Sequence, residues 1–178
     1  MEIKNITVDM GDFGQMTLDK TVEELIVLAV KDPLTGTFNR NVMSELRSKL
    51  DREYIYMAMV DVDHLKQVND TYGHVVGDMV IKQVADHLQE VSSTVFRLGG
   101  DEFCVVEKGV PQTLAGEWIR NLQEQLPTRL ELACPTPLAC KVSHGSAHFT
   151  RIADEFSSAL HNADRALYRS KSARLPLD

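Results

Sequence analysis

The sequence YIYMAMVDVD, residues 54–63, joins an uninterrupted apolar run to two acids. A short apolar run bounded by polar residues is typical of a strand buried on both faces of a sheet. Asp61 and Asp63 follow where such a strand leaves the core. The stretch therefore predicts a central strand that carries carboxylates at its end.

A second acidic stretch, Gly99-Gly100-Asp101-Glu102, lies between the apolar runs 94–98 and 103–106. A Gly-Gly pair between two such runs predicts a β-hairpin, since glycine supplies the positive φ that a tight turn needs. If the hairpin lies beside the first strand, carboxylates from both stretches converge at one edge of one sheet.

Such a cluster of acids favours a metal ion. At about 4 Å and an effective dielectric near 20, each like-charged pair costs on the order of 4 kcal/mol, and a divalent cation offsets this repulsion. Ligands that are all oxygen indicate magnesium, manganese or calcium rather than zinc. For either stretch alone, the competing interpretation is a polar turn whose acids face solvent.

Composition limits the class of protein. The chain has 178 residues, of which 43% are hydrophobic, and this suits one globular domain with its own core. A formal charge of −7 without a basic stripe argues against binding nucleic acid through its phosphates. Three cysteines without a Cys-x-x-Cys pair indicate neither a disulfide framework nor zinc, so we expect a cytoplasmic protein. No apolar segment reaches the roughly 20 residues of a membrane span, so we expect no membrane insertion of this chain.

The first residues show no hydrophobic period, so residues 1 to about 16 are expected to be an irregular lead-in. A helix is expected from Thr21, which is spaced from Glu24 as in a capping box, to the residue before Asp32-Pro33. This helix either pairs with another helix or lies alone on the domain. Its apolar stripe consists of Leu18, Val22, Leu25 and Ala29.

Further helices are expected where apolar residues recur every three or four positions. The first covers residues 42–50, with Asn39 or Asn41 as its cap, and the second covers residues 76–91. The third covers residues 111–126, beginning at Pro111 with Trp118 inward. The last begins at an Asp154 cap, and its inward residues are Phe156, Leu160, Ala163 and Leu167. Residues 138–149 are expected to be mostly extended. This order predicts an α/β (α+β) fold with an antiparallel or mixed sheet, related to the ferredoxin-like plan.

A nucleotide site needs metal ligands, open backbone N–H groups, a cation for the phosphates and polar side chains that read the base. The candidates are Asp61 and Asp101 for the metal, Gly99 and Gly100 for the backbone, Lys66 and Lys171 for the phosphates, and Asn69 with Asp78 for the base. A carboxylate opposite the N1–H and N2–H₂ groups of guanine favours guanine over adenine.

Motifs over residues 32–171 resemble, in order and spacing, the GGDEF family of diguanylate cyclases. They are DPLTGTFNR (32–40), DVDHLKQVNDTYGHVVGD (61–78), RLGGDEF (97–103) and ADRALYRSK (163–171). The resemblance implies a polymerase-palm-like fold with a central, mostly antiparallel five-stranded sheet flanked by helices. It also implies that two GTP molecules are joined into the second messenger cyclic di-GMP, with release of two pyrophosphates.

The resemblance further implies roles for individual residues. Magnesium or manganese ions would be held by Asp61, Asp101 and the Val62 carbonyl. Glu102 would hold a second ion or help deprotonate the attacking 3′-hydroxyl. The guanine would bind to Asn69 and Asp78, and the phosphates would contact Lys66, the Leu65 backbone and Lys171. Each domain holds one GTP, so the productive enzyme would be a homodimer, stable or transient.

Two departures from the family pattern bear on ligand binding. The family's inhibitory product site is Arg-x-x-Asp, whereas Glu90 and Ser93 occupy these positions here, so product inhibition at that site is not expected. The usual Lys-x-x-Gly-Arg becomes Lys171-Ser172-Ala173-Arg174-Leu175, which displaces or removes the second cation for the phosphates. Some relatives that make mixed cyclic dinucleotides carry serine at the position of Asp78, so the resemblance implies guanine on both sides here.

The altered basic motif motivates an alternative function. A catalytically weak or inactive GGDEF domain could bind GTP or a cyclic dinucleotide and signal through the N-terminal helix. In both cases we expect residues 1–31 to form a lead-in and a linker or signalling helix, and residues 32–178 to form the GGDEF catalytic domain.

Other reactive side chains are given structural interpretations. Cys104 reads as a small buried hydrophobe. His144 and His148 lie in an extended stretch, where four residues span roughly 13 Å and cannot share one metal ion. Arg97 is expected either to contact a phosphate or to pair with Asp101 or Glu102.

Overall fold

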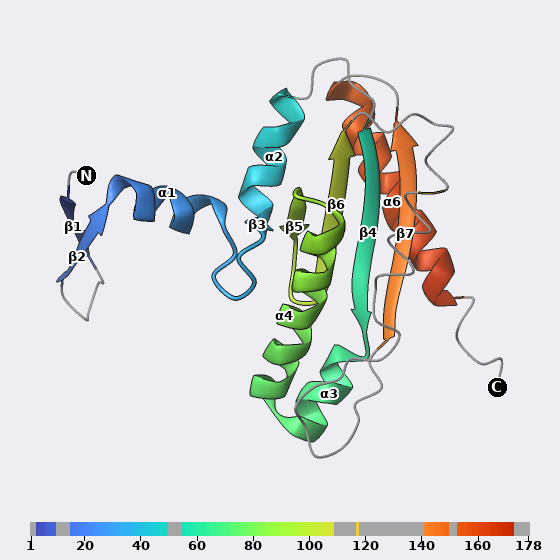
Figure 1. Cartoon of the computed structure of the whole chain (residues 1–178), viewed down its shortest axis with the longest axis horizontal. Helices are drawn as coiled ribbons and strands as arrows, with labels where there is room; N and C mark the ends of the chain where they lie inside the picture. Colours follow the sequence, from blue (N-terminus) through green and yellow to red (C-terminus); the bar gives the residue numbers. More distant parts are fainter. Residues whose placement is uncertain are drawn as a thin grey trace.

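The computed structural model describes residues 3–9, 15–49, 55–108, 117, 141–149 and 153–172. In these ranges a five-stranded sheet carries helices on both faces, and a separate two-stranded hairpin stands at the N-terminus (Figure 1). The elements are β1 (Ile3–Asp9), β2 (Gln15–Thr21), α1 (Val22–Val30), β3 (Phe38–Asn39), α2 (Arg40–Lys49), β4 (Ile55–Asp63), α3 (Leu65–Tyr72), α4 (His74–Val91), β5 (Val95–Arg97), β6 (Glu102–Lys108), β7 (Lys141–Phe149) and α6 (Ala153–Ser172).

The large sheet has the strand order β3-β5-β6-β4-β7. The β4 strand pairs antiparallel with both β6 and β7, and β5 pairs antiparallel with β6. Only the short edge pairing of β3 with β5 is parallel among these strands. The predicted mostly antiparallel five-stranded sheet flanked by helices is therefore confirmed, and β4, from the apolar run, is one of its interior strands.

The apolar run of β4 is buried on both faces, as predicted, because each face packs against a different pair of helices. Ala58, Val60 and Val62 face a core that includes α3 and α4. Met57 and Met59 face the other core, which includes α2 and α6. On α4 the predicted inward stripe is confirmed, since Val80, Val84 and Leu88 are fully buried. On α6, Ala163 and Leu167 are buried and Leu160 packs beside them.

The N-terminal segment corrects one expectation. Instead of an irregular lead-in, β1 and β2 form an antiparallel pair in which Ile6 lies opposite Leu18 and Val8 lies opposite Met16. The sequence alternates apolar and polar residues here with the period of a strand. Leu18 therefore belongs to β2 and not to the helical stripe.

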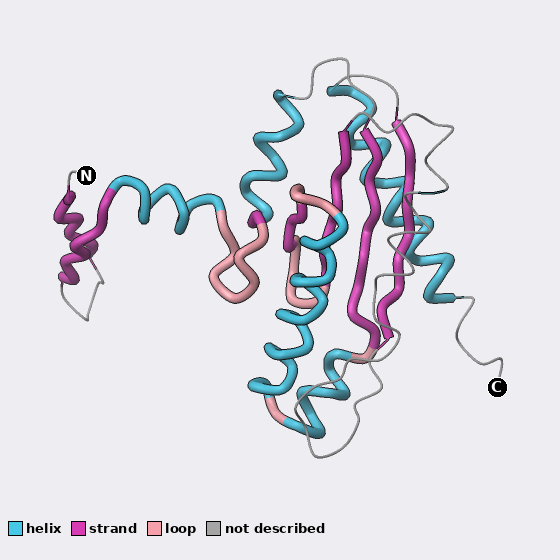
Figure 2. Tube along the Cα trace, viewed as in Figure 1, coloured by secondary structure: helices cyan, strands magenta, loops and turns pink. Residues whose placement is uncertain are grey.

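Helix α1 begins where the capping box was predicted. The Thr21 hydroxyl accepts a hydrogen bond from the Glu24 N–H at 3.2 Å, and the Glu24 carboxylate accepts one from the Thr21 N–H at 2.7 Å. The helix ends at Val30, just before Asp32-Pro33. In Figure 2 this helix and the hairpin lie to one side of the sheet.

The caps of two other helices can be compared with the predictions. Asn39 caps α2, because its side-chain oxygen accepts hydrogen bonds from the N–H groups of Asn41 and Val42. Helix α6 begins at Ala153, so Asp154 lies in its first turn and not at its cap. The expected extended stretch appears as β7. Of the helix predicted over residues 111–126, only Glu117 is described, and it is helical; Pro111 and Trp118 lie outside the described residues.

No helix within the described ranges is long and apolar enough to cross a membrane.

Candidate functional site

The acids of β4 and β6 meet at one end of the sheet. The antiparallel register places Asp61 directly opposite Glu102. Strand alternation puts both side chains on the face of Met59 and Cys104, which is the face covered by α6. One step further, the Val62 N–H donates a hydrogen bond of 3.1 Å to the Asp101 carbonyl. The two acidic stretches of the sequence therefore lie side by side.

Asp61 and Glu102 line a pocket of about 450 Å³ between the sheet end and α6. Asp61 is only 5% exposed. The α6 helix adds Asp164, Arg165, Leu167, Tyr168 and Arg169 to the lining. Asp101 is not among the described lining residues, although its backbone is bonded to β4.

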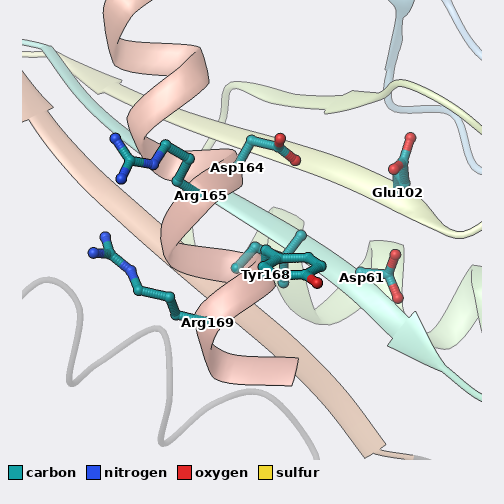
Figure 3. A pocket seen from close by; sticks show the side chains of 7 residues that line it. Asp61, Glu102, Asp164, Arg165, Tyr168 and Arg169 are labelled. Atoms are coloured by element: carbon teal, nitrogen blue, oxygen red, sulfur yellow. The ribbon is translucent and has the colours of Figure 1, made fainter. Parts of the chain in front are cut away.

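The pocket has two ends of different charge. In Figure 3, Asp164 and Tyr168 project from α6 toward the side of Glu102 and Asp61, while Arg165 and Arg169 point to the opposite side of the helix. The sequence patterns identified Lys171 as a site residue on this helix and Leu167 as an inward residue, but they did not identify the four polar lining residues. The available signal was helical spacing, because positions 164, 168 and 171 share one face of a helix.

The hairpin turn is built differently from the prediction. Neither Gly99 nor Gly100 has a positive φ. The four residues between β5 and β6 form a longer loop, and loops of this length use turns with negative φ angles. Arg97 holds the loop instead: its Nε donates to the Gly99 carbonyl at 3.1 Å and its Nη2 to the Gly100 carbonyl at 2.7 Å.

Arg97 also forms an ion pair that sequence reasoning missed. Its Nη1 lies 3.0 Å from Asp32 Oδ1, and the two side chains are only 13% and 18% exposed. The expected partners were a phosphate, Asp101 or Glu102. Asp32 is 65 positions away along the chain, and no local pattern connects the two residues. The turn after α1 is thereby fastened to the loop that carries the acids.

The pKa of Asp32 reflects this environment. Partial burial raises the pKa, but hydrogen bonds from the Thr35 hydroxyl, from Arg97 and from the Thr35 N–H, together with the charge of Arg97, outweigh burial and lower the pKa overall. A carboxyl group with a depressed pKa in the folded state stabilises the fold above its unfolded pKa of about 4, and this contribution is lost as the pH falls through the folded value.

We therefore expect Arg97→Met to be destabilising by about 2 kcal/mol at pH 7, since charge-assisted hydrogen bonds are lost. The deficit should shrink below about pH 4, where Asp32 becomes protonated in both proteins. Thermal unfolding of both proteins between pH 7 and pH 2.5 measures this. Lys20→Met is the matched control, because the Lys20–Glu24 pair is 38% and 52% exposed and should contribute little. A deficit that does not change with pH would contradict this account.

The candidate base readers lie on the other face of the sheet, on adjacent helices. Asn69 is half-buried on α3, and Asp78 is exposed on α4. A single residue, Gly73, joins the two helices. The structure thus places the two side chains on neighbouring elements at the sheet end where β4 leads into α3.

The structure describes some of the residues expected to contact the phosphates. Leu65 is the first residue of α3 and is buried, while Lys66 is exposed in the first turn of that helix. His64, just before α3, has a left-handed backbone conformation with a φ of 60°. Lys171 belongs to α6, but its side chain lies outside the described residues.

The donors at this edge fit a magnesium-type ion. The carboxylates of Asp61, Asp101 and Glu102 and the Val62 carbonyl are all oxygen donors on two adjoining segments. Within the described ranges, no three His, Cys, Asp or Glu side chains are gathered as a metal site. Magnesium usually keeps several waters and binds through one or two carboxylates plus substrate phosphates, so the pair of Asp61 and Glu102 suits it better than a full protein cage would.

Cys104 is a structural residue, as predicted. It is fully buried beside the acids, and burial raises the pKa of its thiol to about 12. A thiol with so high a pKa is not a nucleophile near neutral pH. His144 and His148 lie on β7, in agreement with the extended stretch expected there.

Comparisons with known proteins match this chain over most of its length. The family model described as diguanylate cyclase, GGDEF domain, matches residues 29–175. A protein named probable diguanylate cyclase DgcC from Escherichia coli K12 is 33% identical over 158 residues, which cover 84% of this chain and 42% of DgcC. Diguanylate cyclase DgcP from Pseudomonas aeruginosa is 36% identical over 160 residues, 82% of this chain and 23% of DgcP. The chain thus spans less than half the length of these relatives.

Among solved structures, the coiled coil and GGDEF domain of DgcB from Caulobacter crescentus, in complex with c-di-GMP, is similar to this chain. The two share a TM-score of 0.75 and 27% sequence identity, and the match covers 86% of each chain.

Proposed function

This chain belongs to the GGDEF domain family of diguanylate cyclases, and from that premise we propose that it condenses two GTP molecules into cyclic di-GMP with release of two pyrophosphates. The observation that carries the proposal is the register of β4 with β6, which sets Asp61 against Glu102 in one pocket. In this proposal residues 32–178 are the catalytic domain, residues 1–31 are a linker or signalling segment, and the reaction takes place in the cytoplasm.

The metal would be magnesium or manganese, held by Asp61, Asp101, Glu102 and the Val62 carbonyl. When bound, such ions activate the attacking hydroxyl and neutralise charge on the leaving pyrophosphate. The protein keeps Asp61 ready for this role by fixing it on an interior strand with little freedom to move. Glu102 is exposed and serves either as a ligand or as the base that accepts the proton of the 3′-hydroxyl.

The triphosphate would lie at the start of α3. Lys66 and the Leu65 N–H are at the helix N-terminus, where unsatisfied N–H groups and the helix dipole favour anions. The N–H groups of Gly99 and Gly100 would approach the phosphates from the hairpin, and Lys171 would reach them from α6. In this role the chain binds and orients the tail of the nucleotide.

The guanine would be read by Asn69 and Asp78. A carboxylate accepts from both N1–H and N2–H₂ of guanine, whereas adenine presents an acceptor at N1. Asp78 is exposed and therefore accessible to a ligand.

The chemistry requires two chains. The 3′-oxygen of each nucleotide forms a bond to the α-phosphorus of the other, and the bond from that phosphorus to pyrophosphate breaks. Because each domain holds one GTP, two domains must face each other, and the active species is a homodimer that need not be long-lived.

A second function keeps the same ligands without turnover. The replacement of the family's Gly-Arg by Arg174-Leu175 favours a domain that binds GTP or a cyclic dinucleotide and signals through α1. The pairing of Asp61 with Glu102 favours the enzyme instead, since a binding module has no need of both acids.

Incubation of the purified protein with GTP and Mg²⁺, followed by chromatographic separation of the nucleotides, tests the proposal. We expect cyclic di-GMP and pyrophosphate, with a rate per chain that rises with protein concentration because two chains must meet. Chelation of the metal should stop the reaction. If GTP is recovered unchanged at high protein concentration, the binding module is the correct function.

A further inference from the structure

Helix α4 approaches the candidate base reader Asn69 at Gly77, which is buried. A Cβ atom added to Gly77 would overlap the Asn69 side-chain oxygen and would lie 2.9 Å from its Cγ. The three heavy atoms closest to that added atom all belong to the Asn69 amide. The missing side chain of Gly77 therefore makes the space that Asn69 occupies.

The single residue between the two helices enforces this contact. The Gly73 N–H donates to the Asn69 carbonyl at 2.9 Å, and the Gly73 carbonyl accepts from the Gly77 N–H at 3.3 Å. Gly73 has φ 84° and ψ 161°, a conformation that is essentially restricted to glycine. These bonds tie Gly73 to the last turn of α3 and to the first turn of α4, and so limit how far α4 can move away to accommodate a larger residue at position 77.

Packing, and not hydrogen bonding, holds the Asn69 side chain. No hydrogen bond joins its amide to any other residue in the described part of the chain, and Asn69 is half-buried. Its donor and acceptor are thus available to a ligand, while its orientation depends on the surface of α4. The next residue on that helix is Asp78, the second candidate base reader.

We propose that Gly77 is a positioning residue for guanine recognition: by lacking a side chain, it lets the Asn69 amide lie where it can read the base together with Asp78. The inference rests on the proposed function for its assignment of Asn69 to guanine. The geometry couples both base readers to one short segment of α4, so a change at Gly77 acts on GTP through Asn69.

A double-mutant cycle tests the contact independently of activity. In Asn69→Ala, the change Gly77→Ala should raise the melting temperature by about 2 °C, since alanine is the better helix former and its Cβ now has space. With Asn69 present, the same change should lower the melting temperature, because the amide must move. If Gly77→Ala has the same sign in both backgrounds, the proposed contact is overturned.

The KM for GTP tests the role of Gly77 as a positioning residue. The KM for GTP should rise about tenfold in Gly77→Ala and in Asn69→Ala, and the double variant should be no worse than Asn69→Ala alone. The kcat should change much less, because the base is remote from the reacting atoms. Gln89→Ala, an exposed change on the same helix, is the control and should leave KM unchanged.

The two possible failures are distinguishable. If Asn69→Ala leaves the KM for GTP unchanged, the assignment of Asn69 to guanine is wrong and the inference falls with it. If Asn69→Ala raises KM and Gly77→Ala does not, the assignment stands and only the positioning role of Gly77 is overturned. If the protein has no turnover, equilibrium dissociation constants for GTP replace KM in the same comparison.

Discussion

Replacing Asp61 by asparagine is expected to lower the rate of cyclic di-GMP formation by at least about 10³-fold. Metal ions supply several kcal/mol of charge stabilisation in such reactions, and each 1.4 kcal/mol corresponds to a factor of ten. Asp61 is 5% exposed and is fixed between β6 and β7. Glu102, the residue opposite, belongs to another strand with its own register and therefore cannot take the place of Asp61.

The variant also separates metal binding from folding. Mg²⁺ with GTP should raise the melting temperature of the parent protein, because a ligand that binds only the folded state stabilises it. The same addition should have little effect on Asp61→Asn. Asp86→Asn, an exposed change on α4, is the control and should behave like the parent. Turnover above about a tenth of the parent rate in Asp61→Asn would contradict the assignment.

The second large effect is expected in the core on the face of the sheet opposite the acids. Phe103 is fully buried, lies opposite Val60 and packs in the core between the sheet and α4. Phe103→Ala should be destabilising by about 3–5 kcal/mol, the usual cost of deleting a buried aromatic side chain. The residue immediately before it is Glu102, so loss of this anchor should also loosen the hairpin that carries the acid.

Urea unfolding followed by circular dichroism measures the free energy of unfolding of these variants. Phe103→Leu should be much less damaging, because most of the apolar volume remains. Val75→Ala is the surface control: Val75 is 76% exposed, and its loss should change stability by no more than about 0.5 kcal/mol. A cost below about 1 kcal/mol for Phe103→Ala would show that the hairpin does not depend on this side chain.

Patterns with a strong period predicted much of the fold. The buried strand β4, the stripe of α4 and the capping box of α1 were all visible in the sequence, because each depends on residues only a few positions apart. The hairpin β1–β2 was missed although its alternation was present, since two short alternating runs are a weak signal. Its pairing partner is set by contacts that a local pattern does not contain.

The site was predictable in its acids and less so in its surroundings. Asp61 follows the apolar run and Glu102 follows the Gly-Gly turn, and these positions indicated that the two acids would converge. The register of β4 with β6 shows that they do. The bond between Arg97 and Asp32 was not predictable, because it joins residues 65 positions apart. The polar pocket residues of α6 were missed for the same reason: helical spacing identifies a face, but only the packed fold shows what that face meets.

The sheet itself divides the proposed substrate contacts. Asp61 and Glu102 lie on the α6 face, whereas Asn69 and Asp78 belong to helices on the opposite face. A molecule that touches both pairs must wrap around the rim where β4 turns into α3. The length of the ligand then becomes a criterion for recognition alongside base identity. Guanosine alone or pyrophosphate alone contacts one pair of residues, and only a nucleotide long enough to bridge the rim contacts both pairs.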